Sequence, residues 1–146
     1  MEVTIRPMTV HDFGQVYELG TRSYDLTDKP YNYWSIAEVA EHLQEHPGLC
    51  FVAEGEGRVV GSLLGAGTFE IIEDTAHIEW IAVDPACRRQ GIAGRLIETA
   101  VAAIERLGKS QVVADIASDN EYSRGLARKL GFEEGLSVTY FTKRLR

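Results

Sequence analysis

The stretch from Ala76 to Leu107 constrains the fold more than any other part of the sequence. Residues Ala76–Val83 have the pattern of a β-strand, which ends at Asp84-Pro85. A short loop rich in arginine and glycine follows, and from Ile92 to Leu107 apolar side chains recur at helical spacing over about four turns. A strand that leads directly into a long amphipathic helix needs a sheet on which that helix can lie, which favours a fold that combines helices and strands.

The rest of the chain alternates strand and helix patterns. Capping boxes at Thr9–Asp12 and Ser35–Glu38 predict the starts of two helices, and Glu54–Gly57 between two apolar runs predicts a hairpin. The predicted order is βααβββαβαβ, with strands near 3–5, 49–53, 58–66, 76–83, 111–117 and 136–142. We therefore expect an α/β (α+β) fold: a three-layer α/β/α sandwich around a central mixed, mostly antiparallel sheet.

Composition limits the partners of the chain. With 146 residues and no linker-like segment, a single domain over 1–146 is expected. The formal net charge of −7 disfavours sustained binding to nucleic acid, and two cysteines are too few for a secreted disulfide framework. The sequence shows neither a leader pattern nor an apolar run of the ~18 residues that a membrane span needs, so we expect a cytoplasmic protein without membrane or nucleic-acid partners.

The charge is unevenly divided along the chain. Residues 1–87 carry 4 basic and 15 acidic side chains, whereas residues 88–146 carry 11 basic and 7 acidic ones. An anionic ligand is therefore expected to prefer the C-terminal part, and a cationic ligand the N-terminal part.

The loop between the strand and the long helix has the chemistry of an anion site. Gly91 and Gly94 let a ligand approach the backbone where unpaired N–H groups and the positive end of the helix dipole already favour an anion. Arg88, Arg89 and Arg95 add positive charge. Neither a Walker loop nor the dinucleotide-binding G-x-G-x-x-G is present. A glycine-rich turn with solvated arginines is the structural alternative.

Four motifs together indicate a family. Arg88 to Ala93 reads R-x-x-G-x-A, it follows Ile-Ala-Val-Asp-Pro, and Asn120 begins a helix that ends in Lys-Leu-Gly-Phe. The combination resembles the GNAT superfamily of acyl-CoA-dependent N-acyltransferases over nearly the whole chain. The resemblance implies transfer of an acetyl group from acetyl-CoA to a primary amine, of a small molecule or a protein, by direct attack in a ternary complex without a metal. It also leaves a homodimer open, since relatives often dimerise.

The resemblance also implies where acetyl-CoA binds. The strand edge at Ile81–Val83 would pair with the pantetheine amides, the loop would hold the pyrophosphate, and Asn120 would contact the pantetheine arm. The cofactor-binding residues expected on this basis are Ile81, Ala82, Val83, Arg88, Arg89, Gln90, Gly91, Ile92, Ala93, Gly94, Arg95, Asn120 and Ser123.

Acid and base candidates follow from the strand before the loop. Strict alternation predicts that His77, Glu79, Ile81 and Val83 share one face, and Glu79 is the candidate general base. An ion-paired strand carboxylate is the alternative for Glu79, and a structural histidine is the alternative for His77.

The general acid is less defined. Relatives often carry a tyrosine seven residues after the asparagine, where this chain has Ala127, and Tyr122 would point away from the Asn120 face. Tyr140, on the last predicted strand, is the candidate catalytic substitute. A catalytically weak acyl-CoA-binding module is therefore the alternative to an enzyme.

Two further patterns have competing interpretations. His42 to His46 reads H-x-x-E-H, an inverted zinc-protease pattern, but the helix ends at Pro47 and we predict no metal site. Aromatic and acidic side chains around residues 21–34 either shape the acceptor pocket or anchor a long connection to the core; they are Tyr24, Asp25, Asp28, Tyr31, Tyr33 and Trp34.

Overall fold

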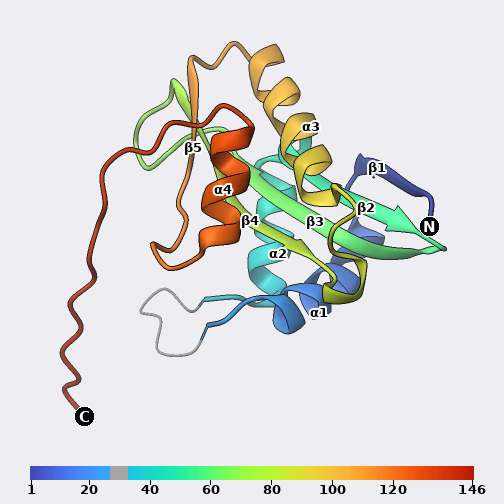
Figure 1. The fold of residues 1–146 in the computed structure, drawn as a ribbon, viewed down its shortest axis with the longest axis horizontal. Coiled ribbons are helices and arrows are strands. Elements are labelled where there is room, and N and C mark those ends of the chain that lie inside the picture. The colour runs from blue at the N-terminus through green and yellow to red at the C-terminus, as the bar shows by residue number, and fades with distance from the viewer. Residues whose placement is uncertain (27–32) are drawn as a thin grey trace. The chain divides into compact units, whose positions relative to one another are not determined.

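The computed structural model describes residues 1–26 and 33–146, so Asp28 and Tyr31 lie outside the described residues. The helices and strands are β1 Val3–Pro7, α1 Phe13–Ser23, α2 Ile36–Glu45, β2 Cys50–Gly55, β3 Arg58–Ala66, β4 Thr75–Val83, α3 Ile92–Arg106, β5 Gln111–Ala114 and α4 Glu121–Lys129 (Figure 1). They fall into two compact units, one formed by 1–24 with 34–115 and the other by 116–146 with 25–33. That the whole of 1–146 acts as one domain remains a prediction.

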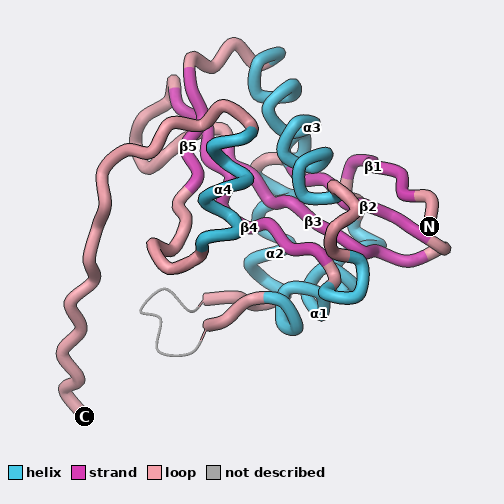
Figure 2. Tube along the Cα trace, viewed as in Figure 1, coloured by secondary structure: helices cyan, strands magenta, loops and turns pink. Residues whose placement is uncertain are grey.

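The first unit is built on a five-stranded sheet in the order β1-β2-β3-β4-β5 (Figure 2). Neighbours from β1 to β4 are antiparallel, whereas β5 runs parallel to β4. The mixed, mostly antiparallel sheet confirms the prediction from sequence. Parallel pairing of β4 and β5 follows from the long crossover through α3 that joins them.

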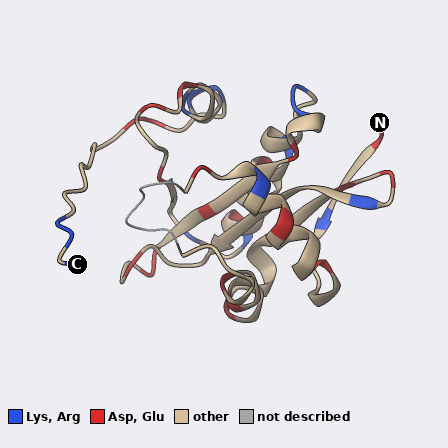
Figure 3. Ribbon diagram, turned by 90° about the horizontal axis from the view of Figure 1, so that it is seen from below, with Lys and Arg blue, Asp and Glu red and all other residues tan. Residues whose placement is uncertain are grey.

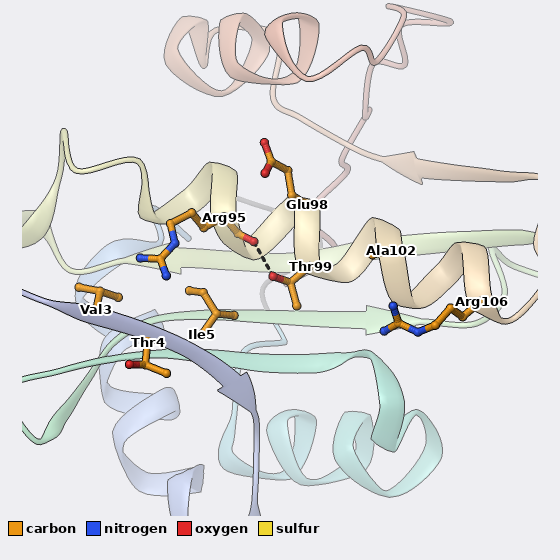
Figure 4. Close-up of a pocket in the computed structure, with 8 residues that line it drawn as sticks. All are labelled: Val3, Thr4, Ile5, Arg95, Glu98, Thr99, Ala102 and Arg106. Carbon is orange, nitrogen blue, oxygen red and sulfur yellow. Dashed lines mark hydrogen bonds between the residues drawn. The ribbon is translucent and has the colours of Figure 1, made fainter.

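Helices cover both faces of this sheet. Helices α1 and α2 pack against β3 and β4, and α3 packs against β1–β4 from the other side, as the three layers in Figure 4 show. The sequence therefore correctly predicts a three-layer α/β/α sandwich. No described helix combines the length and the apolar character that crossing a membrane requires.

Helix α3 is held by the apolar stripe that the sequence predicts. Ile92, Leu96, Ala100 and Ile104 are all buried, and burying each large aliphatic side chain contributes about 1.5–3 kcal/mol. The sheet allows a close approach, because a Cβ on Gly61 of β3 would lie only 3.0 Å from the Ile92 side chain. The start of α3 is thereby fixed relative to the end of β4.

The second unit contains α4 and the C-terminal segment. The strand predicted at 136–142 is not formed, and Leu136, Val138 and Phe141 are exposed. A strand pattern alone does not make a strand, because its amide and carbonyl groups need a partner strand and none pairs with this segment among the described residues. Strand β5 is also shorter than predicted, since it ends at Ala114.

The contact between α1 and Trp34 leads to a prediction about stability. The Trp34 indole lies on Gly20, where an added Cβ would be 2.3 Å from the ring, and its Nε1 donates to the Tyr17 carbonyl oxygen at 3.0 Å. We expect Gly20→Ala to lower the free energy of unfolding by about 1–3 kcal/mol, because the ring must move. Gly14→Ala in the same helix is the control, since a Cβ there meets nothing within 4 Å. Urea unfolding measures both variants, and equal stabilities would contradict this packing.

Candidate active site

Asp84 fixes the end of β4 and the start of the loop. Its backbone N–H donates to the Val60 carbonyl oxygen of β3 at 2.8 Å. Its carboxylate accepts from the Ala86 amide at 3.0 Å and from the guanidinium groups of Arg58 and Arg22 at 2.9 and 3.3 Å. The Ala86 hydrogen bond and then the Arg58 contact lower the pKa of Asp84, so this anchor is an ionised carboxylate.

The loop after this anchor turns sharply into α3. Arg89 and Gly91 both adopt left-handed backbone conformations, with φ of 67° and 73°. Gly91 is the N-cap of α3 and makes no side-chain cap, so the N–H groups of the first turn are left for another acceptor. A Cβ at Gly91 or Gly94 would meet nothing within 4 Å. The backbone therefore forms an open, positively polarised site that suits a phosphate group.

The side chains of the predicted loop residues are placed differently from one another. Arg88, Arg89 and Gln90 are exposed, whereas Ile92 is buried in the core, which leaves its backbone as the part available to a ligand. The Arg95 side chain lies over an open groove of about 580 Å³ between α3 and β1, near Val3 (Figure 4).

On the side of β4 that faces away from β3, the strand extends beyond the last residue that pairs with β5. We call this side the outer edge of β4. Strand pairing between β4 and β5 stops at Ile78 and Ala114. The Asp84 amide points to β3, and alternation along an antiparallel strand then directs the backbone groups of Ile81 and Val83 to the opposite side. In the described sheet, the edge of β4 immediately before the loop therefore lies beyond the last β5 pair; its pairing with a ligand stays a prediction.

A β-bulge changes the side on which Glu79 lies. Leu64 pairs with Trp80 and Gly65 with Ile78, so Glu79 is the extra residue. Its carboxylate contacts α2, whereas Val83 is paired with Gly61, which faces α3. The prediction that Glu79 shares a face with Ile81 and Val83 is therefore wrong, because the bulge interrupts the alternation.

Glu79 meets a buried histidine that the sequence analysis did not connect with it. The His42 side chain is 5% exposed, and its Nε2 lies 2.5 Å from Glu79 Oε2 and 3.2 Å from Glu38 Oε1. Its Nδ1 lies 3.0 Å from the Gly65 carbonyl oxygen. Burial disfavours the charged ring, but contacts with Cys50 and Glu79 outweigh it and raise the pKa of His42 to about 10. Glu38 and His42, four residues apart on α2, were the sequence signal for this cluster.

The H-x-x-E-H pattern does not form a zinc-protease site. His46 accepts a hydrogen bond from the Gly67 amide at 3.2 Å, and the side-chain group around His42 is completed by Glu38 and Glu79. Donor atoms of those three residues lie within 4.8 Å of one another. However, ligands of a tetrahedral zinc ion are roughly 3.3 Å apart. The 2.5 Å contact from His42 to Glu79 is that of a hydrogen bond, so we do not identify these residues as metal ligands.

His77 is engaged elsewhere. Its Nε2 lies 2.5 Å from Asp115 Oδ1, and its ring packs edge-on against Phe69. This contact lowers the pKa of Asp115. The arrangement favours the structural interpretation of His77 over a place in a proton path with Glu79.

The aromatic residues before α2 form a cluster beside β4. The ring of Trp34 lies 5.0 Å from Trp80 and 5.1 Å from Tyr24, and it stacks with Tyr17 at 6.3 Å. The Tyr24 hydroxyl is buried without a hydrogen-bond partner among the described residues, and burial raises its pKa. Trp34 and Tyr24 are thus packed within the first unit, and their rings form a wall next to Trp80 of β4.

The remaining predicted residues belong to the second unit. The Asn120 side chain accepts from the Ser123 amide at 3.1 Å and caps α4. Tyr140, the speculative acid, is 62% exposed in a segment without regular structure. Tyr122 is exposed as well. Roles for these residues in binding or catalysis stay predictions.

The charged state of His42 gives a prediction about stability. A pKa raised from about 6.5 to about 10 means that the folded protein holds a proton that the unfolded chain releases. This contribution is fully present below pH 6.5 and is lost as the pH rises through 10, by at most about 1.4 kcal/mol per pH unit. Thermal unfolding at pH 6, 8 and 10 should show a difference between wild type and His42→Gln that shrinks with pH. A difference independent of pH would contradict a charged His42.

Comparison with known proteins agrees with this geometry. Residues 14–132 match the acetyltransferase (GNAT) family. Aminoglycoside N(6')-acetyltransferase type 1 of Acinetobacter haemolyticus is 32% identical over 124 residues, which cover 77% of this chain and 85% of the relative. An N-alpha-acetyltransferase of Sulfurisphaera tokodaii is 26% identical over 91% of this chain and 81% of its own length.

A solved structure shows the same fold. AAC(6')-Iy in complex with the bisubstrate analogue CoA-S-monomethyl-acetylneamine superposes with a TM-score of 0.77 at 23% identity, covering 99% of both chains. The family match over most of the chain and the similarity to curated acetyltransferases define the protein's class. The chain belongs to the acetyltransferase (GNAT) family and is an acyl-CoA-dependent N-acetyltransferase.

Proposed function

We propose that the protein binds acetyl-CoA along the outer edge of β4 and transfers its acetyl group directly to a cationic primary amine, with Glu79 as general base. The observation that carries this proposal is the position of Glu79 on the strand whose outer backbone edge leads into the anion site at Gly91. Cofactor and base are thereby brought to one strand of the first unit.

Acetyl-CoA has two points of attachment in this proposal. Unpaired N–H groups at the start of α3 bind the pyrophosphate, with charge from Arg88 and Arg89. The backbone groups of Ile81 and Val83 continue the sheet by pairing with the pantetheine amides. The thioester then lies further along β4, toward Glu79. Asn120 and Ser123 of the second unit are proposed to contact the pantetheine arm.

Apart from the transfer of the acetyl group itself, the reaction consists of proton transfers from the amine and to the CoA thiolate. Glu79 takes a proton from the ammonium group, and the neutral amine attacks the thioester carbonyl carbon. A C–N bond forms, the C–S bond breaks, and the nitrogen loses a second proton while the departing thiolate of CoA takes one up. A thiol with a pKa of about 8.5 leaves tolerably as the thiolate, so a protein acid is dispensable; Tyr140 remains the candidate if one acts.

The surroundings of Glu79 favour a positively charged acceptor. The side chains of Glu38 and Glu79 are 17% and 25% exposed. Trp80, next to Glu79 on β4, forms an aromatic cluster with Trp34, which lies just before α2. Carboxylates attract an ammonium group, and aromatic faces attract cations. The relatives named above carry both an aminoglycoside and an N-alpha activity in their names, so a polyamine sugar and a protein α-amine are the two acceptor classes to test first.

The remaining parts of the proposal concern the setting of the enzyme. We place it in the cytoplasm as a single domain over 1–146 that acts with acetyl-CoA and an amine and without a metal ion. Whether the chain forms a homodimer is tested by light scattering.

The first test concerns the anion site. Gly91→Glu should weaken acetyl-CoA binding at least about tenfold, because the side chain repels the pyrophosphate and L-residues rarely adopt a φ of 73°. Gly48→Glu is the control, since it adds the same charge on an exposed turn where a Cβ meets nothing within 4 Å. Isothermal titration measures both. Unchanged affinity of Gly91→Glu would refute this placement of the cofactor.

The second test concerns the base. Glu79→Gln should lower kcat for a primary amine by about 10²–10⁴-fold while acetyl-CoA still binds, since the loss of a general base removes proton transfer and leaves the backbone site intact. Glu56→Gln, in the turn between β2 and β3, is the control with the same chemical change. Release of the CoA thiol reports the rate. A Glu79→Gln enzyme with wild-type kcat and pH dependence would show that another group acts as base.

A further inference from the structure

We propose that His42 is a positioning residue for the acetyl transfer: as an imidazolium it orients the Glu79 carboxylate and keeps it ionised beside Glu38. The proposal rests on the role of Glu79 as general base. It assigns a function to a buried histidine of α2 that contacts Glu79 of β4.

The hydrogen-bond partners of His42 fit a doubly protonated ring. A carbonyl oxygen only accepts, so the ring must donate from Nδ1 to Gly65, at 3.0 Å. Nε2 faces the carboxylates of Glu79 and Glu38 at 2.5 and 3.2 Å. Because both ring nitrogens face acceptors, the doubly protonated ring satisfies every contact. The raised pKa of His42 agrees with this geometry.

The charges around His42 explain why a cation is needed there. Glu38 faces it from α2 and Glu79 from β4, while Cys50 of β2 and the His46 ring, 6.0 Å away, complete its surroundings. Glu45 lies further along α2, beside His46. Two carboxylates so close together cannot both stay ionised easily without a positive charge between them.

The positive charge of the His42 ring favours the ionised form of Glu79, which is the form that catalysis requires. A base must be ionised to accept a proton, and Glu38 alone would raise the pKa of its neighbour Glu79. The His42 cation offsets that repulsion and holds one oxygen of Glu79 in place. The Glu79 side chain is hydrogen-bonded to the buried His42 ring and remains 25% exposed to solvent.

The experiment compares pH profiles. In His42→Gln, the acidic limb of kcat/KM should move up by about 1–3 pH units, because an adjacent opposite charge shifts a carboxyl pKa by that amount. At pH values below the acidic pKa, each pH unit of this shift lowers kcat/KM about tenfold relative to wild type. The KM for acetyl-CoA should stay within about twofold. His46→Gln, one turn further along α2, is the matched control and should keep the wild-type profile.

The double variant separates an electrostatic role from a structural one. Removing the charge of Glu38 as well, in Glu38→Gln/His42→Gln, should return the acidic limb toward its wild-type position, because the repulsion between Glu38 and Glu79 is then removed together with the cation that offset it. A purely structural role of His42 predicts no such rescue. A limb that stays shifted in the double variant would therefore overturn the proposal.

Two measurements keep the outcomes distinct. In the wild-type protein, ¹⁵N NMR should show both ring nitrogens of His42 protonated at pH 8, and a neutral ring there would overturn the proposal even if the variants fail to fold. Glu79→Gln distinguishes a failure of the proposed function from a failure of the inference about His42. If this variant keeps full activity, Glu79 is not the base and the proposed function is wrong. If it is inactive while His42→Gln keeps the wild-type acidic limb, Glu79 stands as base and the inference about His42 fails.

Discussion

The carboxylate of Asp84 determines where β4 ends, and the geometry of the site depends on that point. Its contacts reach Arg22 of α1 and Arg58 of β3, and they hold the Ala86 amide at the start of the loop. The two arginines are about half exposed, so water and salt weaken the attraction. The main effect of these contacts is on position: they fix the end of β4 and the first residues of the loop that leads to α3.

Charge is divided in the structure as well as in the sequence, but less simply than the totals suggest. The acidic part supplies Glu38 and Glu79, which lie together beside α2. Basic residues of the C-terminal part include the loop arginines and also Lys143, Arg144 and Arg146 near the end of the chain (Figure 3). The proposed function assigns a role to the loop arginines alone, so the net charge by itself does not say which basic residues serve the ligand.

The sequence predicts those features that depend on neighbouring residues. The strand, the loop at Gly91 and the buried stripe of α3 all lie within one short stretch, and the structure confirms the secondary structure predicted for it. Glu79 was correctly assigned to β4, but the bulge depends on how β3 and β4 pair and cannot be read from one strand. The His42–Glu79 contact joins residues 37 positions apart for the same reason. The strand predicted at 136–142 lacked the partner strand that its pattern requires.

The bulge at Glu79 also separates two kinds of recognition within one strand. Under the proposed function, β4 binds the cofactor through main-chain atoms, which every residue type offers. It contacts the acceptor through side chains, which differ from residue to residue. Substitutions of the side chains that face α2 then alter the choice of amine without changing the groups that bind CoA. A scaffold of this kind can diversify its acceptors while its donor stays constant, as a family whose relatives carry different acceptor names requires.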